Sequence, residues 1–208
     1  MERSAVEPKG PEMEVTSREQ RAAPRVMLLI RPAKLLTPEG EFVCVIRDVS
    51  ATGISVRLFH PLPAGQIATL ETETGMRVAM QRVWARETEA GFRFDRQIDV
   101  AALINEIGAY RKRRLRLAIE LPVTVSFLGQ SHPAVIHNLS QQGARIDCDA
   151  RLALAQLVRL TSDYLPEIRA QVRWRRENRY GLVFEDTFSL GEFAQMAALL
   201  QSPSLLGR

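Results

Sequence analysis

Short apolar runs separated by turn-forming residues make up most of the chain after about residue 18. Ile54, Val56 and Leu58 alternate with polar residues, which is the period of a strand with one buried face. Segments rich in glycine and proline separate the runs and indicate turns. The pattern predicts strands over residues 42–46, 54–58, 67–70, 76–84 and 91–94.

The period changes after residue 98. Apolar residues recur at helical spacing from Val100 to Ile107, and Asp99 is suited to cap the first turn, which predicts a helix over residues 99–109. The same order of elements then starts again. We expect strands over residues 122–127, 134–137, 157–160, 168–174 and 181–184, and a final helix over residues 189–200.

The two halves of the chain keep a constant offset of 90 residues. A period of this size is that of a whole domain, so it indicates duplication and not a solenoid. Several short strands followed by one helix predict a mainly β fold, with two tandem small β-barrels each followed by a C-terminal helix. The paired positions are Asp48 and Asn138, Ser50 and Ser140, Gly53 and Gly143, Trp84 and Trp174, Gly91 and Gly181, and Phe94 and Phe184.

We divide the chain into three parts on this basis. Residues 1–17 are rich in Glu and Pro and lack an apolar period, so we expect a disordered tail there. Residues 18–110 form the first domain and residues 111–208 the second. A chain of 208 residues with 46% hydrophobic and 25% charged residues is long and apolar enough for two such domains.

The net charge of +4 gives only a mild preference for anionic partners. The two cysteines, Cys44 and Cys148, are far apart and form no zinc-binding spacing, so we expect buried thiols and no metal. No apolar run approaches the roughly 18 residues that span a bilayer. The first twenty residues are polar, without a signal-peptide pattern. We therefore expect a cytoplasmic protein that does not insert into membranes.

Two short motifs precede and follow the expected first strand region. Arg21 and Arg25 stand four residues apart, and guanidinium groups both grip phosphate oxygens and stack on bases. Asp48, Ser50 and Gly53 follow in a turn between strands, where the carboxylate could accept hydrogen bonds from the edge of a guanine. We expect Gly53 to supply a positive φ. The structural alternative is a solvated basic loop, with Asp48 and Ser50 capping backbone amides of the turn.

The repeated aromatic residues have a structural interpretation. Aromatic side chains at strand positions usually belong to a core. We predict this for Phe94 and Phe184, and mostly for Trp84 and Trp174.

Together the motifs resemble those of the PilZ family of cyclic di-GMP receptors, which carry an RxxxR segment and then a [D/N]xSxxG turn on a small β-barrel. The resemblance implies that Arg21 and Arg25 hold phosphate and base, Asp48 and Ser50 contact a guanine, and Gly53 shapes the turn. It also implies a bacterial receptor that binds this second messenger without catalysis or cofactor. The segment before the first strand would become ordered on binding and signal in trans to an unidentified protein effector.

The second copy departs from this pattern at one position. Asn138, Ser140 and Gly143 are intact, and Lys112-xxx-Arg116 stands ahead of them. Arg116 precedes Asn138 by 22 residues, and Arg25 precedes Asp48 by 23. The resemblance makes these five residues the ligand-binding set of the second domain.

The alignment of this segment stays open by one residue, because the offset of 90 pairs Arg111 with Arg21 and Leu115 with Arg25. Lys112 can neither stack nor bind phosphate bidentately as an arginine does. We therefore predict one principal site in the first domain, with weaker binding or none in the second.

Three alternatives compete with the receptor. An enzyme would need a catalytic constellation, but His60, His132 and His137 stand in no catalytic or metal-binding motif, and we predict no catalytic residue. A protein-docking module without ligand remains open, above all for the second domain.

A basic β-barrel that binds nucleic acid is the third alternative. The aromatic content of 6% provides no repeated stacking platform for single strands, so we expect no nucleic-acid partner. The arginines around Trp174 that suggest it are Arg169, Arg173, Arg175, Arg176 and Arg179.

Overall fold

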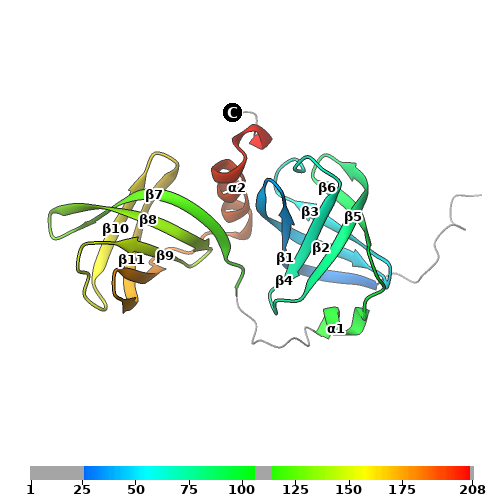
Figure 1. Ribbon diagram of the computed structural model, residues 1–208, viewed down its shortest axis with the longest axis horizontal. Helices are drawn as coiled ribbons and strands as arrows, with labels where there is room; N and C mark the ends of the chain where they lie inside the picture. The colour runs from blue at the N-terminus through cyan, green and yellow to red at the C-terminus, as the bar shows by residue number, and fades with distance from the viewer. Residues whose placement is uncertain (1–25, 106–113, 207–208) are drawn as a thin grey trace, which may run out of the picture.

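The computed structural model describes residues 26–105 and 114–206. In these ranges the chain forms two closed antiparallel barrels of six strands each (Figure 1). The strand order around the first barrel is β1-β2-β3-β6-β5-β4, and the second repeats it as β7-β8-β9-β12-β11-β10. The predicted fold, mainly β with two tandem barrels, is confirmed. The predicted tail over residues 1–17 lies outside the described residues.

The first barrel consists of β1 (Val26–Thr37), β2 (Gly40–Val49), β3 (Gly53–Leu58), β4 (Ile67–Thr72), β5 (Arg77–Arg86) and β6 (Glu89–Phe94), and α1 (Val100–Asn105) follows it. The second consists of β7 (Leu117–Phe127), β8 (Gln130–Ser140), β9 (Gly143–Cys148), β10 (Leu157–Ser162), β11 (Leu165–Arg176) and β12 (Arg179–Phe184). It is followed by α2 (Leu190–Gln201) and the short 3-10 helix η1 (Pro203–Leu206).

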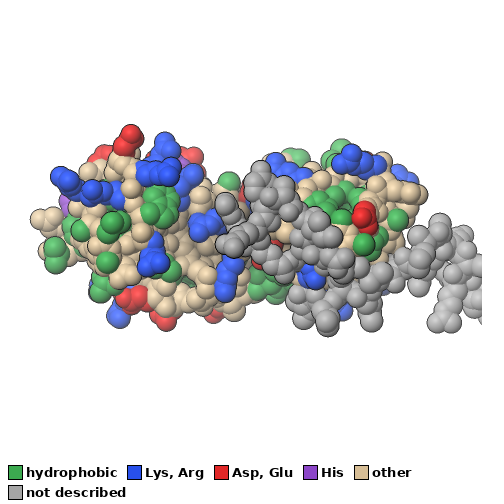
Figure 2. Space-filling model, turned by 90° about the horizontal axis from the view of Figure 1, so that it is seen from below, with side chains coloured by type: hydrophobic (Ala, Val, Ile, Leu, Met, Phe, Trp, Pro, Cys, Tyr) green, Lys and Arg blue, Asp and Glu red, His purple; other side chains and the backbone are tan. Residues whose placement is uncertain are grey.

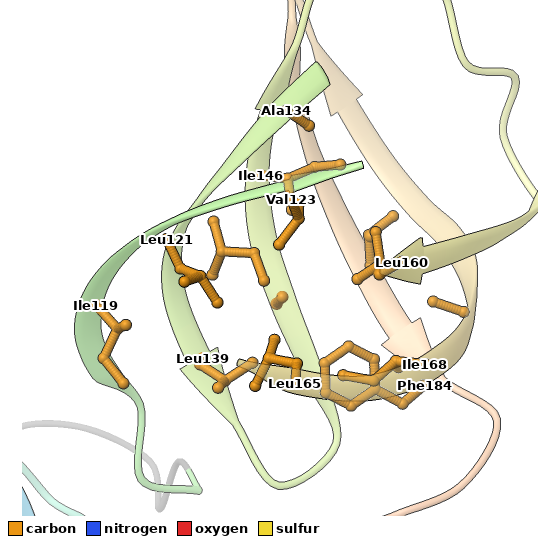
Figure 3. Packing of buried hydrophobic residues seen from close by; sticks show 14 of the residues in the cluster. Ile119, Leu121, Val123, Ala134, Leu139, Ile146, Leu160, Leu165, Ile168 and Phe184 are labelled. Atoms are coloured by element: carbon orange, nitrogen blue, oxygen red, sulfur yellow. The ribbon is translucent and has the colours of Figure 1, made fainter. Parts of the chain in front are cut away.

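Alternating burial closes each barrel around its own core. Every second residue of β7, from Leu117 to Val125, is buried, as expected for strands whose side chains point alternately into and out of a barrel. Apolar side chains from the strands meet in the middle of the second barrel (Figure 3). Phe94 and Phe184 are buried in their barrels, as the sequence predicted.

The apolar pattern predicted five strands per copy where the structure has six. It missed β1 and β9. A register shift between Met27 and Arg31 breaks the period of β1, and Pro32 follows directly. β9 begins at Gly143, and the first of its inward positions is the small Ala144, so its alternation is faint in the sequence.

The two helices differ in length within the described residues. The backbone N–H of Ala101 donates to Asp99 Oδ1 at 2.9 Å, so Asp99 caps α1 as predicted. The predicted continuation of α1 beyond residue 105 lies outside the described part of the chain. α2 begins with a capping box, in which Ser189 and Glu192 each accept a hydrogen bond from the other's backbone N–H. No helix in the described residues is long and apolar enough to cross a membrane.

α2 lies between the two barrels (Figure 1). Phe193, Ala194 and Ala197 belong to the apolar cluster of the second barrel, whereas Ala198 belongs to that of the first. Val43, on β2 of the first barrel, packs into the second barrel's cluster. The helix that ends the second domain therefore joins both cores.

Polar contacts reinforce this junction. The side chain of Gln201, the last residue of α2, donates to the carbonyl oxygen of Glu41 at 2.8 Å and accepts from the Glu41 N–H at 2.8 Å. The Glu41 carboxylate accepts a hydrogen bond from the N–H of Ala118 at 2.9 Å. The start of β2 is thus tied to both the end of α2 and the start of β7.

Candidate functional site

Each barrel carries a tight connection at the motif that the sequence repeats. In the first, the N–H of Ser50 donates to the carbonyl oxygen of Gly53 at 2.8 Å, and the Ser50 hydroxyl donates to the same oxygen at 3.3 Å. In the second, the Ser140 hydroxyl donates to the Gly143 carbonyl at 2.9 Å. Both serines are buried. Their hydroxyls close the turn by donating to a carbonyl oxygen, which is a structural role other than the expected capping of a backbone amide.

The sequence predicted that Asp48 lies in the turn, but the residue lies within β2, where it pairs with Ser55 of β3. Asn138 holds the same place in β8. A register shift stands directly before each of them, and such a bulge re-aims the following side chain. The Ser55 hydroxyl donates to Asp48 Oδ2 at 2.9 Å, and Arg116 Nη1 donates to Asn138 Oδ1 at 3.2 Å.

The motif glycines are required by space and not by backbone angle. Neither Gly53 nor Gly143 has a positive φ, so the expectation for Gly53 is wrong. A Cβ on Gly53 would stand 2.7 Å from the carbonyl oxygen of Phe92, and one on Gly143 would collide with the carbonyl oxygen of Leu182. Only glycine lets these strands approach so closely.

Trp84 and Trp174 lie outside the cores, which corrects the prediction for them. They are 38% and 42% exposed. A register shift in β5 directly before Trp84, and another in β11 directly before Trp174, turn each indole from the inner to the outer face. Each ring then lies over a glycine of the next strand, Gly91 or Gly181, where a Cβ would collide with the indole.

These features surround one pocket on each barrel. The first-barrel pocket has a volume of about 220 Å³ and the second-barrel pocket about 940 Å³. Lining the first are Asp48, Ser50, Thr52, Gly53, Ile54, Ser55, Val83, Trp84, Gly91, Phe92 and Arg93. Lining the second are Arg114, Arg116, Asn138, Ser140, Gln142, Gly143, Ala144, Arg145, Arg173, Trp174, Arg176, Glu177, Arg179, Gly181, Leu182 and Val183.

The structure brings together most of the predicted site residues. Asp48, Ser50 and Gly53 share the first pocket, and their counterparts share the second with Arg116. Three predicted residues, Arg21, Arg25 and Lys112, lie outside the described residues.

The bulge at the start of each barrel bears on the open alignment. Arg25 and Arg116 each directly precede the first residue of β1 and β7. The bulge in β1 is one residue longer than the bulge in β7. Residues before the bulge are therefore equivalent at an offset of 91, and residues after it at an offset of 90. Leu115, the alternative partner of Arg25, is buried in the core of the second barrel. The geometry therefore favours Lys112-xxx-Arg116 as the second copy's segment.

The two pockets differ in charge as well as in volume. Among the described residues, the charged side chains that line the first pocket are Asp48 and Arg93. The second pocket is lined by six arginines and one glutamate. Blue Lys and Arg side chains are visible over the second barrel, at the left of Figure 2.

Arg145 was not predicted from the sequence, and the arginines around Trp174 were linked there to nucleic acid and not to this pocket. Arg145 lies on β9, the strand that the apolar pattern did not predict. Its Nε is buried without a hydrogen-bond partner among the described residues. Arg179 Nε lies 3.9 Å from Asp147 Oδ2, and His137 Nε2 lies 3.4 Å from the same oxygen. No group of three or more His, Cys, Asp or Glu suited to a metal ion occurs in the described part of the chain.

The arrangement can hold an anion beside a planar ring. Guanidinium groups give charge-assisted, often bidentate hydrogen bonds to phosphate. An exposed indole offers a face for stacking, and the side-chain amide of Asn138 or the carboxylate of Asp48 offers acceptors next to it.

Comparison with known proteins gives the family. The sequence profile of the PilZ domain matches this chain twice, over residues 19–113 and 110–202. No curated protein matches the chain.

Solved structures that the comparison matches include the Borreliella burgdorferi PlzA protein in complex with c-di-GMP, at 11% identity over 83% of this chain and 88% of that one, with a TM-score of 0.34. They also include the Bacillus subtilis inhibitor of motility MotI/DgrA, at 13% identity over 88% of this chain and 99% of that one, with a TM-score of 0.33. A third is Escherichia coli YcgR in complex with c-di-GMP, at 14% identity over 79% of this chain and 80% of that one, with a TM-score of 0.31. At such values these likenesses add nothing to the assignment, which rests on the double profile match. The chain belongs to the PilZ domain family and carries two copies of the domain.

Proposed function

We propose that this protein is a cyclic di-GMP receptor that binds its ligand on the outer walls of its barrels, without turning it over, and signals in trans to a protein effector. The observation that carries the proposal is the second-barrel pocket. There Arg116 contacts Asn138, and Ser140, Gly143 and Trp174 line the same hollow. Membership of the PilZ family, which the motifs associate with cyclic di-GMP, supports the choice of this ligand.

The proposed roles follow from side-chain chemistry. In the second domain Lys112 and Arg116 hold phosphate, Asn138 and Ser140 face a guanine, and Gly143 lets the strands close behind it. Asp48, Ser50 and Gly53 act in the same way in the first domain. Arg21 and Arg25 are its phosphate ligands in this proposal.

Isothermal titration of the full chain with cyclic di-GMP tests the proposal, with GTP and cyclic di-AMP as controls. We expect micromolar or tighter binding of cyclic di-GMP alone. Arg116→Ala should weaken the second domain's binding, whereas Arg169→Ala, which removes the same charge on β11 outside this pocket, should not. Absence of binding, or equal binding of all three nucleotides, would overturn the proposal.

A second measurement addresses catalysis and the competing ligand. Incubation with cyclic di-GMP should release no linear product. Binding to single-stranded oligonucleotides that is as tight as to cyclic di-GMP and falls steeply with salt would instead favour a nucleic-acid partner.

Signalling in trans implies that ligand changes the receptor. We expect the segment before β1, which holds Arg21 and Arg25, to become protected from proteolysis when cyclic di-GMP binds. Unchanged cleavage of this segment at saturating ligand would contradict that part of the proposal.

A further inference from the structure

The two pockets are built on the same strand register but differ in charge. In both barrels the tryptophan pairs with a glycine across the strands, Trp84 with Gly91 and Trp174 with Gly181. Positions can therefore be compared one by one. Arg145 stands where the first barrel has Ser55, and Arg173 stands where it has Val83.

The hairpin beside the pocket shows the same difference in a pair of residues. In the first barrel Arg86 faces Glu89 across β5 and β6. In the second barrel Arg176 faces Arg179 across β11 and β12. Like charges directly opposite each other destabilise a sheet. Asp147, whose Oδ2 lies 3.9 Å from Arg179 Nε, offsets part of this repulsion, and an anion bound at the pocket would offset more of it.

A buried donor points to the same conclusion. Arg145 is half-buried and lines the pocket, and its Nε has no hydrogen-bond partner among the described residues. A buried donor without an acceptor is costly. Because Arg145 also lines the pocket, a phosphate bound there would offer its guanidinium group an acceptor.

We infer that the second barrel holds the tighter of the two ligand sites, and that Arg145, Arg173, Arg176 and Arg179 are phosphate-binding residues outside the shared motif. The inference rests on the proposed function. It reverses the order of affinities that the motif alone predicts, in which Lys112 weakens the second domain. Three of these arginines have no arginine at the equivalent position of the first barrel, and together they outweigh the loss of one guanidinium group.

The chain offers a site-resolved test because it has two tryptophans, one in each pocket. In Trp84→Phe only Trp174 fluoresces and reports on the unaltered second pocket. In Trp174→Phe only Trp84 fluoresces and reports on the unaltered first pocket. Titration of both variants with cyclic di-GMP should show Trp174 saturating at a ligand concentration roughly tenfold lower or more, as expected for one additional charge-assisted contact.

Charge variants identify the residues responsible. In the Trp84→Phe background, Arg173→Gln and Arg176→Gln should each weaken binding roughly tenfold. Arg169→Gln is the matched control, because it removes one charge from the same strand but does not line the pocket. In the Trp174→Phe background, Val83→Arg places a guanidinium at the exposed position equivalent to Arg173 and should tighten the first site.

The outcomes separate this inference from the proposed function. If the wild-type chain binds no cyclic di-GMP, the proposed function fails. If the chain binds but Trp84 saturates first or together with Trp174, the inference alone is overturned. Equal effects of Arg173→Gln and Arg169→Gln would also overturn it, because they would reflect only the net charge.

Discussion

At Gly91 and Gly181 a single missing side chain decides where an aromatic ring lies. The indoles of Trp84 and Trp174 lie against these glycines on the outer face of the barrels. The glycines have ordinary backbone angles, so the requirement is for space alone. Each exposed ring is thereby held in place as one wall of a pocket.

Gly181→Ala should therefore displace Trp174 and destabilise the second barrel by about 1–3 kcal/mol, as overpacking does. Urea unfolding, followed by circular dichroism and tryptophan fluorescence, measures both effects. Gly191→Ala on α2 is the control: its Cβ would meet Phe59 at an ordinary 3.4 Å, and alanine should raise stability by up to about 1 kcal/mol. Equal stabilities of Gly181→Ala and the wild type would contradict the role of the glycine.

His60 is a buried titratable residue that follows β3. Its Nδ1 lies 2.7 Å from the Pro61 carbonyl oxygen, its ring centroid lies 5.3 Å from that of Phe42, and its Nε2 is buried with no partner among the described residues. Burial lowers the pKa of His60 below 6.5, and the hydrogen bond to Pro61 opposes this only in part. The folded state therefore favours the neutral ring.

The lowered pKa of His60 sets the direction in which the stability of the protein changes with pH. Because the folded pKa of His60 is below the unfolded one, the unfolded chain binds the proton first as pH falls. The stability that neutral His60 provides is present above about pH 6.5 and is lost as pH falls through the folded pKa, with a slope of at most about 1.4 kcal/mol per pH unit. His60→Phe should remove this component, and His132→Gln should keep it. Urea unfolding between about pH 7.5 and about pH 5, on either side of the ordinary histidine pKa, measures the free energy of unfolding against pH. Equal slopes for the wild type and His60→Phe would contradict this prediction.

At the scale of elements, bulges decide which face each side chain occupies. Burial alternates along β5, and along β11 from Ile168, up to the shift before Trp84 and Trp174, and the shift reverses the facing of the residues after it. The alternating burial of β7 extends back to Leu115, which lies in the core, and leaves Arg116 at the pocket. Every departure of a candidate site residue from its expected place follows such a bulge or the unpredicted strand β9.

The capping box of α2 gives a prediction for an element. Ser189 accepts from the N–H of Glu192 at 3.2 Å, and Glu192 accepts from the N–H of Ser189 at 2.8 Å. Ser189→Ala should lower the free energy of unfolding by about 1 kcal/mol. Ser204→Ala, at an exposed position of η1, should leave it unchanged. Urea unfolding compares the two, and an unchanged midpoint for Ser189→Ala would show that the cap does not contribute.

At the scale of the whole molecule, α2 makes the barrels depend on each other. Its apolar residues belong to the core clusters of both barrels. The side chain of Gln201 also forms hydrogen bonds with the N–H and the carbonyl of Glu41, as a neighbouring strand would. Glu41 in turn contacts Ala118, two residues after Arg116 of the second pocket. The junction between the barrels thus lies next to a candidate ligand site.

Gln201→Ala should loosen this junction, because the N–H and the carbonyl of Glu41 lose their partners at a cost of about 1–3 kcal/mol. In the Trp174→Phe chain the remaining Trp84 reports the unfolding of the first barrel, and in the Trp84→Phe chain Trp174 reports that of the second. We expect their urea transitions to coincide with Gln201 present and to separate in Gln201→Ala. Gln171→Ala, whose hydrogen bond to Ala155 stays within the second barrel, should leave them coincident. Coincident transitions in both variants would contradict the coupling.

The sequence by itself determined the duplication, the mainly β fold, the helix that starts after Ser189, and the motif positions from Asp48 to Gly53 and from Asn138 to Gly143. These follow from local signals, namely the period of apolar residues, caps and turn residues, which short stretches of chain carry on their own. Only the tertiary structure decided that the tryptophans face outward, that Arg116 and not Leu115 lines the pocket, that Arg145 joins it, and that α2 links the barrels. The physical reason is that bulges and interfaces depend on strands distant in sequence, and one inserted residue turns every following side chain to the other face.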